Sequence, residues 1–375
     1  MLTPAFFYDS LRSHGVDFFA GVPDSLLKDF CAYVTDHSAG TNHIITANEG
    51  AAVALASGHY LATGRPAVVY MQNSGQGNAV NPLMSLCDPD VFGIPMLLLV
   101  GWRGEPGTED EPQHVKQGKI TLDLFKAMGI PHTVLPDEEA AAARCLDEAA
   151  RTMRATAAPY ALVVRTGTFS GYKLRTKIPT SYEHMREGAL RLVCGALDAS
   201  SIIVATTGKT SRELFELRGE TGATQDMDFR TVGCMGHASQ IALGIALARP
   251  DRRIVCLDGD GAVLMHMGSL AIIGTQRPAN LTHIVFNNGA HDSVGGQPTA
   301  GFAIDIPQIA RACGYRSVRC AATTSEILEA MASLDGAPGP SLLEIRVNTG
   351  ARNDLGRPTT SPAANKTALM ARLQG

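Results

Sequence analysis

The sequence predicts an α/β protein of two domains, each a mostly parallel sheet with helices on both faces. Short apolar runs alternate with helical patterns along most of the chain, which is typical of parallel strands joined by crossover helices. The alternation is interrupted once, over residues 169–188, and then starts again. With 375 residues, of which 45% are hydrophobic and 18% are charged, the chain can bury a core in each half.

The first domain is expected to span residues 1–168. Its short apolar runs predict strands, and its longer patterns with a helical period predict helices. In chain order we expect a helix at 4–14, strands at 18–21 and 43–46, a helix at 49–63, and strands at 67–71, 95–100 and 161–165. The strand at 67–71 runs into Gln72-Asn73-Ser74-Gly75-Gln76-Gly77, whose glycines and polar residues predict a loop.

A linker is predicted at 169–188, where glycine, proline, hydroxyl residues and mixed charges replace the alternating pattern. The second domain is expected at 189–350, and residues 351–375 form a tail with a proline-rich turn and a short helix. In chain order we expect a strand at 201–205, helices near 211–217 and at 238–248, a strand at 254–257, a helix at 267–274, a strand at 282–286, a helix at 306–313 and a strand at 341–346.

Composition excludes several classes of protein. The formal net charge is −4 and no long basic run occurs, which argues against a nucleic-acid partner or a polybasic membrane anchor. The apolar stretches are too short to cross a bilayer, and charged residues within the first 20 positions exclude a signal peptide. The eight cysteines form no Cys-x-x-Cys pair, so we expect reduced cysteines that serve as small core residues in a cytoplasmic protein.

The strongest chemical motif spans two successive predicted strands. One strand ends in Asp258-Gly259-Asp260-Gly261, and the next ends in Asn287-Asn288. Two strands joined by one crossover helix usually lie parallel and close together, so Asp260 and Asn288 should meet at the carboxyl edge of the sheet. A carboxylate and an amide oxygen provide a partial shell for Mg²⁺ that leaves positions open for phosphate oxygens.

This motif resembles the signature of the thiamine-diphosphate-dependent decarboxylases, in which Gly-Asp-Gly is followed by Asn-Asn. From Gly259 to Asn288 the chain counts 30 residues, as that signature requires. The resemblance implies that the protein binds thiamine diphosphate and Mg²⁺. It places Asp260, Asn288 and Ala290 on the metal, and it adds Gly259, Gly261 and Ala262 to the residues that contact the cofactor.

A second loop, Gly208-Lys209-Thr210-Ser211, is similar to the end of a phosphate-binding P-loop. The P-loop motif needs a further glycine where this chain has Ile203, so this loop is not a P-loop. Likewise, Gly259-Asp260-Gly261 is not a dinucleotide-binding fingerprint, because that motif needs a third glycine where this chain has Leu264. The Gly208 loop still follows a strand and opens a helix, so its backbone can hold a diphosphate. The resemblance assigns it that role.

Further residues match the family in both domains. Glu49 follows a strand and opens a helix, where the family carries the glutamate that activates the cofactor through the pyrimidine N1′. The stretch Gly233-Cys234-Met235-Gly236 resembles the segment that holds the aminopyrimidine, with the Gly233 carbonyl as acceptor and Met235 as the wedge that bends the cofactor. Because Glu49 and Asp260 lie in different domains, the resemblance implies a homodimer or larger assembly with active sites at the subunit interface.

The short length, without a third domain, is similar to the branch of the family that acts on phosphonopyruvate or sulfopyruvate. The resemblance therefore implies decarboxylation of 3-phosphonopyruvate to phosphonoacetaldehyde and CO₂ in phosphonate or antibiotic biosynthesis. The alternatives are a sulfopyruvate decarboxylase that gives sulfoacetaldehyde and a non-catalytic cofactor-binding subunit. Candidate substrate-binding residues are Asp24, Ser25, Lys28, Gln297 and Arg357, the last in a tail expected to pack near the active site.

Proton transfer needs a separate group. Several longer relatives carry a histidine near the strand end before the first-domain glycine loop, and this chain has Met71 there. We therefore expect the catalytic proton donor among four residues, Ser25, His114, His291 and Asp292.

Overall fold

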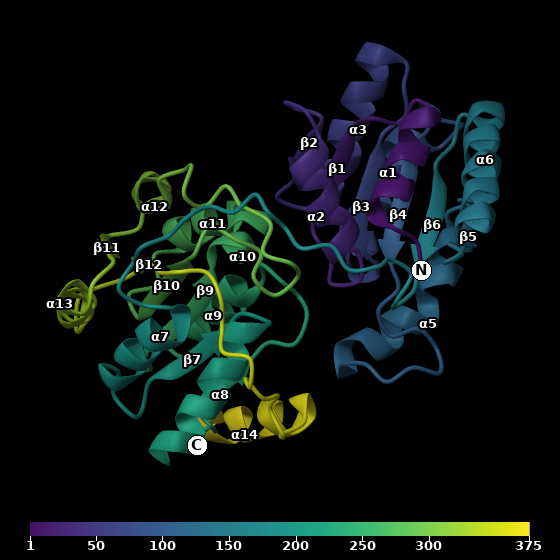
Figure 1. The fold of residues 1–375 in the computed structure, drawn as a ribbon. Helices are drawn as coiled ribbons and strands as arrows, with labels where there is room; N and C mark the ends of the chain where they lie inside the picture. Colours follow the sequence, from purple (N-terminus) through teal and green to yellow (C-terminus); the bar gives the residue numbers. More distant parts are fainter. Residues whose placement is uncertain (375) are drawn as a thin grey trace. The chain divides into compact units, whose positions relative to one another are not determined.

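The computed structural model describes residues 1–374 of the chain. These residues form two compact units, which run in Figure 1 from purple to teal and from teal to yellow. The first unit holds Met1–Lys177 together with the segment Ser293–Gln297, and the second holds Ile178–Asp292 together with the residues from Pro298 onward. Each unit has its own sheet and its own hydrophobic core, which confirms the predicted α/β class.

The sheet of the first unit has the strand order β2-β1-β3-β4-β6-β5, and each pair of neighbours is parallel. Its strands are β1 (Phe19–Gly21), β2 (His43–Ile45), β3 (Val68–Gln72), β4 (Leu97–Gly101), β5 (His132–Val134) and β6 (Tyr160–Val164). The central strands β3, β4 and β6 are buried almost along their whole length, because helices cover both faces.

Helices α1, α2 and α6 cover one face of this sheet, and α3, α4 and α5 cover the other. Their bounds are α1 (Pro4–Ser13), α2 (Lys28–His37), α3 (Glu49–Thr63), α4 (Gln76–Pro82), α5 (Pro112–Ala127) and α6 (Glu139–Thr156). Helix α3 shows why such a segment begins and ends where it does. The Asn48 side chain accepts a hydrogen bond from the N–H of Ala51 over 2.9 Å, and Gly64 ends the helix with a φ of 68°.

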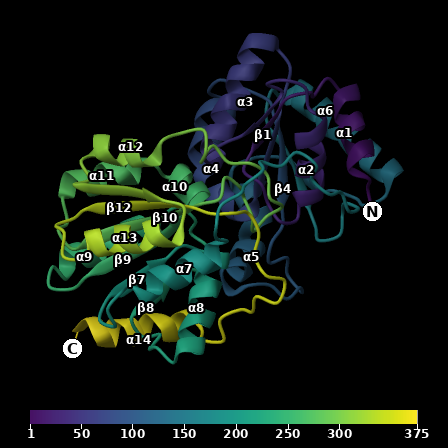
Figure 2. The same cartoon turned by 60° about the vertical axis from the view of Figure 1, so that its left-hand side comes forward.

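The sheet of the second unit has the order β11-β12-β10-β9-β7-β8 and is again parallel at each pairing. Its strands are β7 (Ile202–Ala205), β8 (Asp228–Arg230), β9 (Ile254–Gly259), β10 (Leu281–Asn287), β11 (Ser317–Ala321) and β12 (Ser341–Arg346). Helices α7, α8 and α13 cover one face, whereas α9, α10, α11, α12 and α14 contribute to the other. Figure 2 shows this second sheet with helices on both sides.

The bounds of these helices are α7 (Arg186–Gly195), α8 (Lys209–Thr221), α9 (Ala238–Ala248), α10 (Asp260–Met265), α11 (Gly268–Gln276), α12 (Ile306–Cys313), α13 (Thr324–Leu334) and α14 (Pro362–Gln374). The strand order of each sheet also fixes where a ligand site can form. The chain leaves β1 toward β2 but continues from β3 toward β4 on the other side, so the loops after β1 and β3 diverge. The loops after β7 and β9 diverge in the same way. A crevice at the carboxyl ends of the strands opens at such a switch point.

The last helix covers the edge strand of the second sheet. The buried side chain of Asn365 in α14 accepts a hydrogen bond from the N–H of Arg230 over 3.1 Å and donates to the carbonyl of Asp228 over 2.7 Å. One amide side chain thus pairs with backbone groups of β8 that would otherwise lack a strand neighbour. Earlier in the tail, Arg212 of α8 donates to the carbonyls of Leu355 and Gly356.

Some sequence predictions need correction. Most of the loop predicted at 72–77 is helical, because a single 3₁₀ turn η1 (Asn73–Gly75) leads directly into α4. Helix α7 begins at Arg186, inside the predicted linker. Cys234 and Cys320 are exposed, so the expectation of cysteines as core residues is wrong for these two, although all eight cysteines are unpaired. Within the described residues no helix has the length and apolar composition that a membrane crossing requires.

Candidate functional site

In the second unit, Asp260 is the first residue of α10, directly after β9. Its side chain is 2% exposed, and Oδ2 accepts a hydrogen bond from the hydroxyl of Thr299. The burial raises the pKa of Asp260 to about 6, although the Thr299 hydroxyl and the N–H of Asn288 act in the other direction. Among residues 1–374 no lysine, arginine or histidine pairs with this carboxylate, so a buried negative charge here lacks a cation.

The register of the two strands places the predicted metal ligands together. Gly259 of β9 is paired with Phe286 of β10, so Asp260 and the two asparagines follow at the same carboxyl edge. The asparagines have different tasks. The Asn287 amide donates to Glu344 Oε1 over 2.6 Å and to the Gly301 carbonyl over 2.8 Å, which makes it a structural residue.

The second asparagine is oriented by a carboxylate. Asn288 Nδ2 donates to Asp292 Oδ2 over 2.9 Å, and that same oxygen accepts from the N–H of Gly350 over 2.8 Å. The Asn288 Oδ1 atom accepts only the N–H of Ala290, at 3.1 Å, among the described residues. Because an amide oxygen has a second lone pair, Oδ1 can still bind a metal. Asp292, one of the predicted proton donors, thus holds the Asn288 amide in place through its carboxylate.

Asp292 is in turn supported by a buried ion pair. Arg186 donates to Glu213 through Nε at 2.8 Å and Nη2 at 2.7 Å, and its Nη1 lies 3.6 Å from Asp292 Oδ2. Lys209, which follows Gly208, donates to the carbonyl of Asp292 over 3.1 Å. Burial lowers the pKa of Lys209, while the Asp292 carboxylate raises it. The loop after β10 is therefore tied to the start of α8.

The loop after β7 has the form predicted for a diphosphate cradle. Gly208 has a φ of 91°, a conformation that favours glycine, and α8 begins at the next residue. Thr210 and Ser211 are buried in its first turn, and the Ser211 hydroxyl donates to the carbonyl of Thr206 over 2.7 Å. The N–H groups of this first turn have no partner within the helix.

Two further predicted cofactor residues lie beside the Asp260 turn. A Cβ built on Gly261 would be 3.5 Å from Cε of Met235 and 3.2 Å from Cε1 of His291, so both side chains pack against this glycine. Gly233, near Met235, donates its N–H to the Thr207 hydroxyl over 2.9 Å and has a φ of 70°. Burial lowers the pKa of His291 to about 4, so its ring is neutral at pH 7.

The residues of this half-site fit a divalent cation and a diphosphate. No basic side chain of the described residues pairs with the buried Asp260 carboxylate, and Asn288 Oδ1 is held beside the same turn. A Cβ on Gly301 would approach Asp260 Oδ2 and Asn287 Oδ1 to 2.6 Å each, so glycine leaves room for this arrangement. Ala262 and Gly259 belong to the same turn, and Ala290 follows Asn288 at the same edge.

Behind this turn lies a separate buried cluster. One ligand atom each of Cys256, Asp258 and His283 lie within 4.8 Å of one another. The His283 Nε2 atom is 3.4 Å from Asp258 Oδ2, and Nδ1 is 3.4 Å from the Tyr315 hydroxyl. These polar groups of β9 and β10 therefore satisfy one another inside the core.

In the first unit, the predicted activating residue Glu49 is the first residue of α3 and is 5% exposed. Asn78 donates to Glu49 Oε2 over 2.7 Å. A Cβ on Gly75 would overlap the Glu49 carboxylate, so glycine at this position is needed to accommodate it. Both partners come from the segment after β3, and Glu49 comes from the segment after β2, so the carboxylate lies at the carboxyl edge of the sheet.

Asp24 and Ser25 follow β1 at the switch point of this sheet. Asp24 is fully buried, with Oδ1 accepting from Gln72 over 2.7 Å and Oδ2 accepting from the N–H of Leu26 over 2.9 Å. Burial raises the pKa of Asp24, and these hydrogen bonds lower it in part. The Ser25 hydroxyl accepts a hydrogen bond from Nη1 of Arg103 over 2.8 Å.

Arg103, Asp110 and Thr299 are site residues that sequence reasoning missed. The Arg103 guanidinium donates to Asp110 through Nε at 2.8 Å and through Nη2. The predicted proton donor His114 has its Nδ1 atom 2.9 Å from Asp110 Oδ1. Although burial acts to raise it, hydrogen bonds from Arg103, His114 and two backbone N–H groups hold the pKa of Asp110 well below its usual range.

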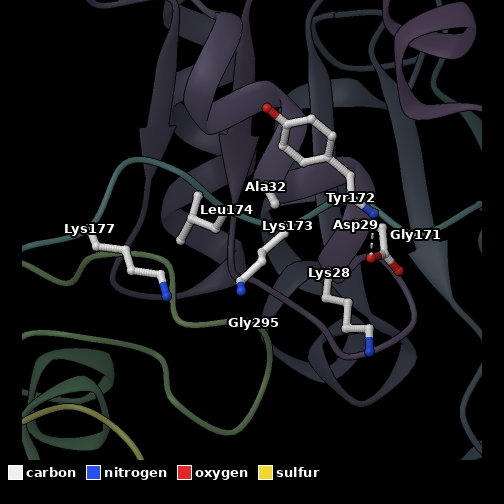
Figure 3. Close-up of a pocket in the computed structure, with 9 residues that line it drawn as sticks. All are labelled: Lys28, Asp29, Ala32, Gly171, Tyr172, Lys173, Leu174, Lys177 and Gly295. Carbon is white, nitrogen blue, oxygen red and sulfur yellow. Dashed lines mark hydrogen bonds between the residues drawn. The ribbon is translucent and has the colours of Figure 1, made fainter.

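Lys28, a predicted substrate residue, is the first residue of α2. Lys28 lines a basin of about 430 Å³, where Figure 3 shows its ammonium group with those of Lys173 and Lys177. The buried Gln297 donates to the Lys28 carbonyl over 3.4 Å, so its amide contacts the backbone rather than the ammonium group. Arg357, another predicted substrate residue, directly follows the Gly356 turn that contacts α8 of the second unit.

Comparison with known proteins agrees with this geometry. Residues 3–128 match the family described as the N-terminal TPP binding domain of thiamine pyrophosphate enzymes, and residues 206–345 match the C-terminal TPP binding domain. A phosphonopyruvate decarboxylase of Streptomyces hygroscopicus is 37% identical over 367 residues, which cover 94% of this chain and 89% of the relative. The chain belongs to the thiamine pyrophosphate enzymes.

Two more relatives of this thiamine pyrophosphate enzyme act on 2-oxo acids with a phosphonate or a sulfonate group, as their names state. A phosphonopyruvate decarboxylase of Streptomyces viridochromogenes is 36% identical over 94% of this chain and 90% of its own length. A sulfopyruvate decarboxylase of Methanosarcina acetivorans is 25% identical over 95% of this chain and 94% of its own length. The similarity to both therefore spans nearly all of the thiamine pyrophosphate enzyme, including both half-sites.

Proposed function

We propose that this enzyme catalyses the decarboxylation of 3-phosphonopyruvate to phosphonoacetaldehyde and CO₂ with thiamine diphosphate and Mg²⁺. The observation that carries the proposal is the 37% identity to a phosphonopyruvate decarboxylase over 94% of the chain. The residues of the two units support it, because the second unit offers the buried carboxylate of Asp260, which no basic side chain of the described residues neutralises, and the first unit offers the buried carboxylate of Glu49 at the carboxyl edge of its sheet. Such a reaction is a step of phosphonate biosynthesis.

The chain supplies binding and orientation for the cofactor. Asp260, Asn288 and the backbone of Ala290 would hold Mg²⁺, and the first turn of α8 would hold the diphosphate. Met235 and the Gly233 carbonyl would hold the pyrimidine ring. When bound, thiamine diphosphate supplies the electron sink that accepts the electron pair left as CO₂ departs.

Glu49 has the only direct acid–base task that we assign. Its carboxylate is buried, is fixed by Asn78, and would hold a proton at the pyrimidine nitrogen. Replacement of Glu49 by glutamine keeps the shape and removes the proton acceptor. We therefore propose that a Glu49→Gln enzyme binds the cofactor and loses most of its turnover.

The test is a CO₂-release assay with phosphonopyruvate, sulfopyruvate and pyruvate, each with and without thiamine diphosphate and Mg²⁺. Preference for phosphonopyruvate with full dependence on both cofactors supports the proposal. An Asp260→Asn variant should fold and lose Mg²⁺-dependent cofactor binding in isothermal titration. No turnover of any 2-oxo acid by the loaded wild type would instead favour a non-catalytic cofactor-binding subunit.

Sulfopyruvate is the second candidate substrate, because a sulfopyruvate decarboxylase aligns with 95% of the chain. Its lower identity of 25%, against 37%, makes phosphonopyruvate the preferred choice. In the same assay, a higher kcat/KM for sulfopyruvate would reverse the assignment while leaving the decarboxylase class intact.

We also propose self-association into at least a homodimer, with Glu49 of one subunit serving the cofactor held by Asp260 of another. The support is the family resemblance together with the location of the two residues in different units. Size-exclusion chromatography with light scattering tests the assembly directly, and a monomer at assay concentration would contradict it.

A further inference from the structure

Arg103 and Asp110 form a pair in the first unit that the proposed chemistry leaves without a task. We propose that they are positioning residues that fix the Ser25 hydroxyl as a hydrogen-bond donor to an anionic oxygen of the substrate. The inference rests on the proposed function in that it takes the substrate to be a 2-oxo acid.

The backbone of Arg103 is fixed by the turn that also contacts Glu49. The Arg103 N–H donates to Asn73 Oδ1 over 3.2 Å, and Asn73 Nδ2 donates to the Arg103 carbonyl over 2.8 Å. Asn73 begins the turn η1, and Gly75 ends it against the carboxylate of Glu49. One three-residue turn therefore places Arg103 and Glu49 at the same edge of the sheet.

The side chain of Arg103 is fixed by Asp110. Nε and Nη2 of the guanidinium both donate to this carboxylate, which also accepts the N–H groups of Gly104 and Glu111 at 2.7 Å each. The His114 ring contacts the same carboxylate through Nδ1. Because Asp110 holds both Nε and Nη2 of the planar guanidinium, Nη1 has little freedom to move. The protein therefore sets its direction toward Ser25.

This direction determines the polarity of the Ser25 hydroxyl. A guanidinium can only donate, so Ser25 Oγ must be the acceptor in its 2.8 Å contact with Nη1. Within residues 1–374 no acceptor takes the hydroxyl hydrogen of Ser25, which is half-buried. The hydrogen is thus available to a ligand, and donation from a cation strengthens the hydroxyl as a donor.

The location of Ser25 makes a substrate oxygen the natural acceptor. Ser25 follows β1 at the switch point, where the sheet opens toward a ligand. The positive charge of Arg103 is already balanced by Asp110 at hydrogen-bond distance. The pair therefore recognises an oxygen through a directed donor rather than through net charge, and the carboxylate and the phosphonate of the substrate both offer such an oxygen.

The experiment is a double-mutant cycle of Ser25→Ala and Arg103→Gln, with KM and kcat measured for each variant. If Arg103 acts through Ser25, each single variant raises KM about tenfold and the double variant raises it no further. Additive effects, or a wild-type KM in Arg103→Gln, would overturn the proposal. Asp110→Asn should give the same coupling to Ser25, so a misfolded Arg103 variant does not end the test.

Two control variants and the choice of substrate distinguish the proposed role of Arg103 from other causes of a raised KM. Arg65→Gln removes a surface arginine of the same unit that pairs with Asp17 at 2.8 Å, and it should leave KM unchanged. Arg103→Lys keeps the charge without the fork and should recover only part of the affinity. The cycle is run with whichever 2-oxo acid the wild type decarboxylates. The role of Arg103 can therefore be tested even if phosphonopyruvate is not the substrate. An effect confined to phosphonopyruvate places the donor at the phosphonate, and an equal effect on pyruvate places it at the carboxylate.

Discussion

The amide of Asn288 donates to the carboxylate of Asp292 over 2.9 Å, four residues further along the chain. This contact turns Oδ1 of Asn288 away from Asp292, because the oxygen and the nitrogen of the amide lie on opposite sides of the Cβ–Cγ bond. The carboxylate that orients the amide is itself held by the N–H of Gly350 and lies beside the buried Arg186. An orienting carboxylate of this kind is a common support for a metal ligand.

We therefore predict that Asp292→Ala weakens Mg²⁺ binding about 10- to 100-fold, because the Asn288 amide loses its orientation. The measurement is isothermal titration of Mg²⁺ at saturating thiamine diphosphate. The matched control is Asp251→Ala, which removes an exposed carboxylate that pairs with Arg249 at 2.7 Å. Unchanged Mg²⁺ affinity in Asp292→Ala would show that the amide orientation does not depend on this contact.

Gly75→Ala should displace the Glu49 carboxylate, since the new Cβ would occupy the same space. We expect turnover to fall by at least about 100-fold, the loss typical of a misplaced acid–base group. Gly58→Ala in α3 is the control, because a Cβ there meets nothing within 4 Å. Wild-type turnover in Gly75→Ala would mean that Glu49 tolerates the shift or has no part in the reaction.

Subunit complementation tests the proposed sharing of sites. Glu49→Gln and Asp260→Asn chains with different affinity tags are co-expressed, and mixed dimers are isolated by both tags. If a site combines Glu49 of one chain with Asp260 of the other, one of two sites is intact and about half of the wild-type activity returns. Sites built within single chains would leave the mixed dimer as inactive as its parents.

His43 should make the stability of the first unit depend on pH. Burial lowers the pKa of His43 to about 4, and its Nε2 lies 2.8 Å from the Tyr70 hydroxyl. Above the unfolded-state pKa of about 6.5, His43 is neutral in both the folded and the unfolded chain, so its ionisation does not reduce the free energy of unfolding. As the pH falls from about 6.5 to 4, the unfolded chain binds a proton that the folded unit does not, so up to about 3 kcal/mol of stability is lost.

His43→Gln should remove this part of the pH dependence. The chain has a single tryptophan, Trp102, which is buried in the first unit and reports its unfolding by fluorescence. Urea midpoints at pH 7.5, 6.0 and 4.5 give the comparison, with a smaller decline expected for the variant. If the urea midpoints of the wild type and of His43→Gln fell equally with pH, the pH effect would come from other groups.

The sequence was sufficient for the elements that carry the site. The helices at 49–63, 238–248 and 306–313 and the strand at 341–346 have the predicted bounds. Two of these helices are marked at both ends, α3 by Asn48 and Gly64 and α12 by Asp305 and Gly314. The edge strands β5, β8 and β11 were missed. β5 and β8 have three residues each, which is too short to show an alternating pattern. β11 has five residues, but its sequence Ser-Val-Arg-Cys-Ala has two exposed positions side by side and does not alternate.

The partners of the site residues could not be predicted, because they come from distant parts of the chain. Thr299 reaches Asp260 across 39 residues, and Arg103 reaches Ser25 across 78. The spacing of the Gly-Asp-Gly and Asn-Asn motifs predicts which residues would bind the metal, whereas a lone threonine or arginine has no such signature. Asp110 lies in the loop after β4, and its pairing with Arg103 appears only once that loop is folded.

The amide of Asn365 also has a consequence for solubility. An edge strand with free N–H and carbonyl groups is a template on which another chain can add a strand, and this is how many sheets begin to aggregate. By pairing with Arg230 and Asp228, the α14 side chain blocks the edge at β8 without adding a strand. Loss of the last helix would expose this edge, so the C-terminal residues protect the protein from aggregation through β8 even though they lie outside the sheet.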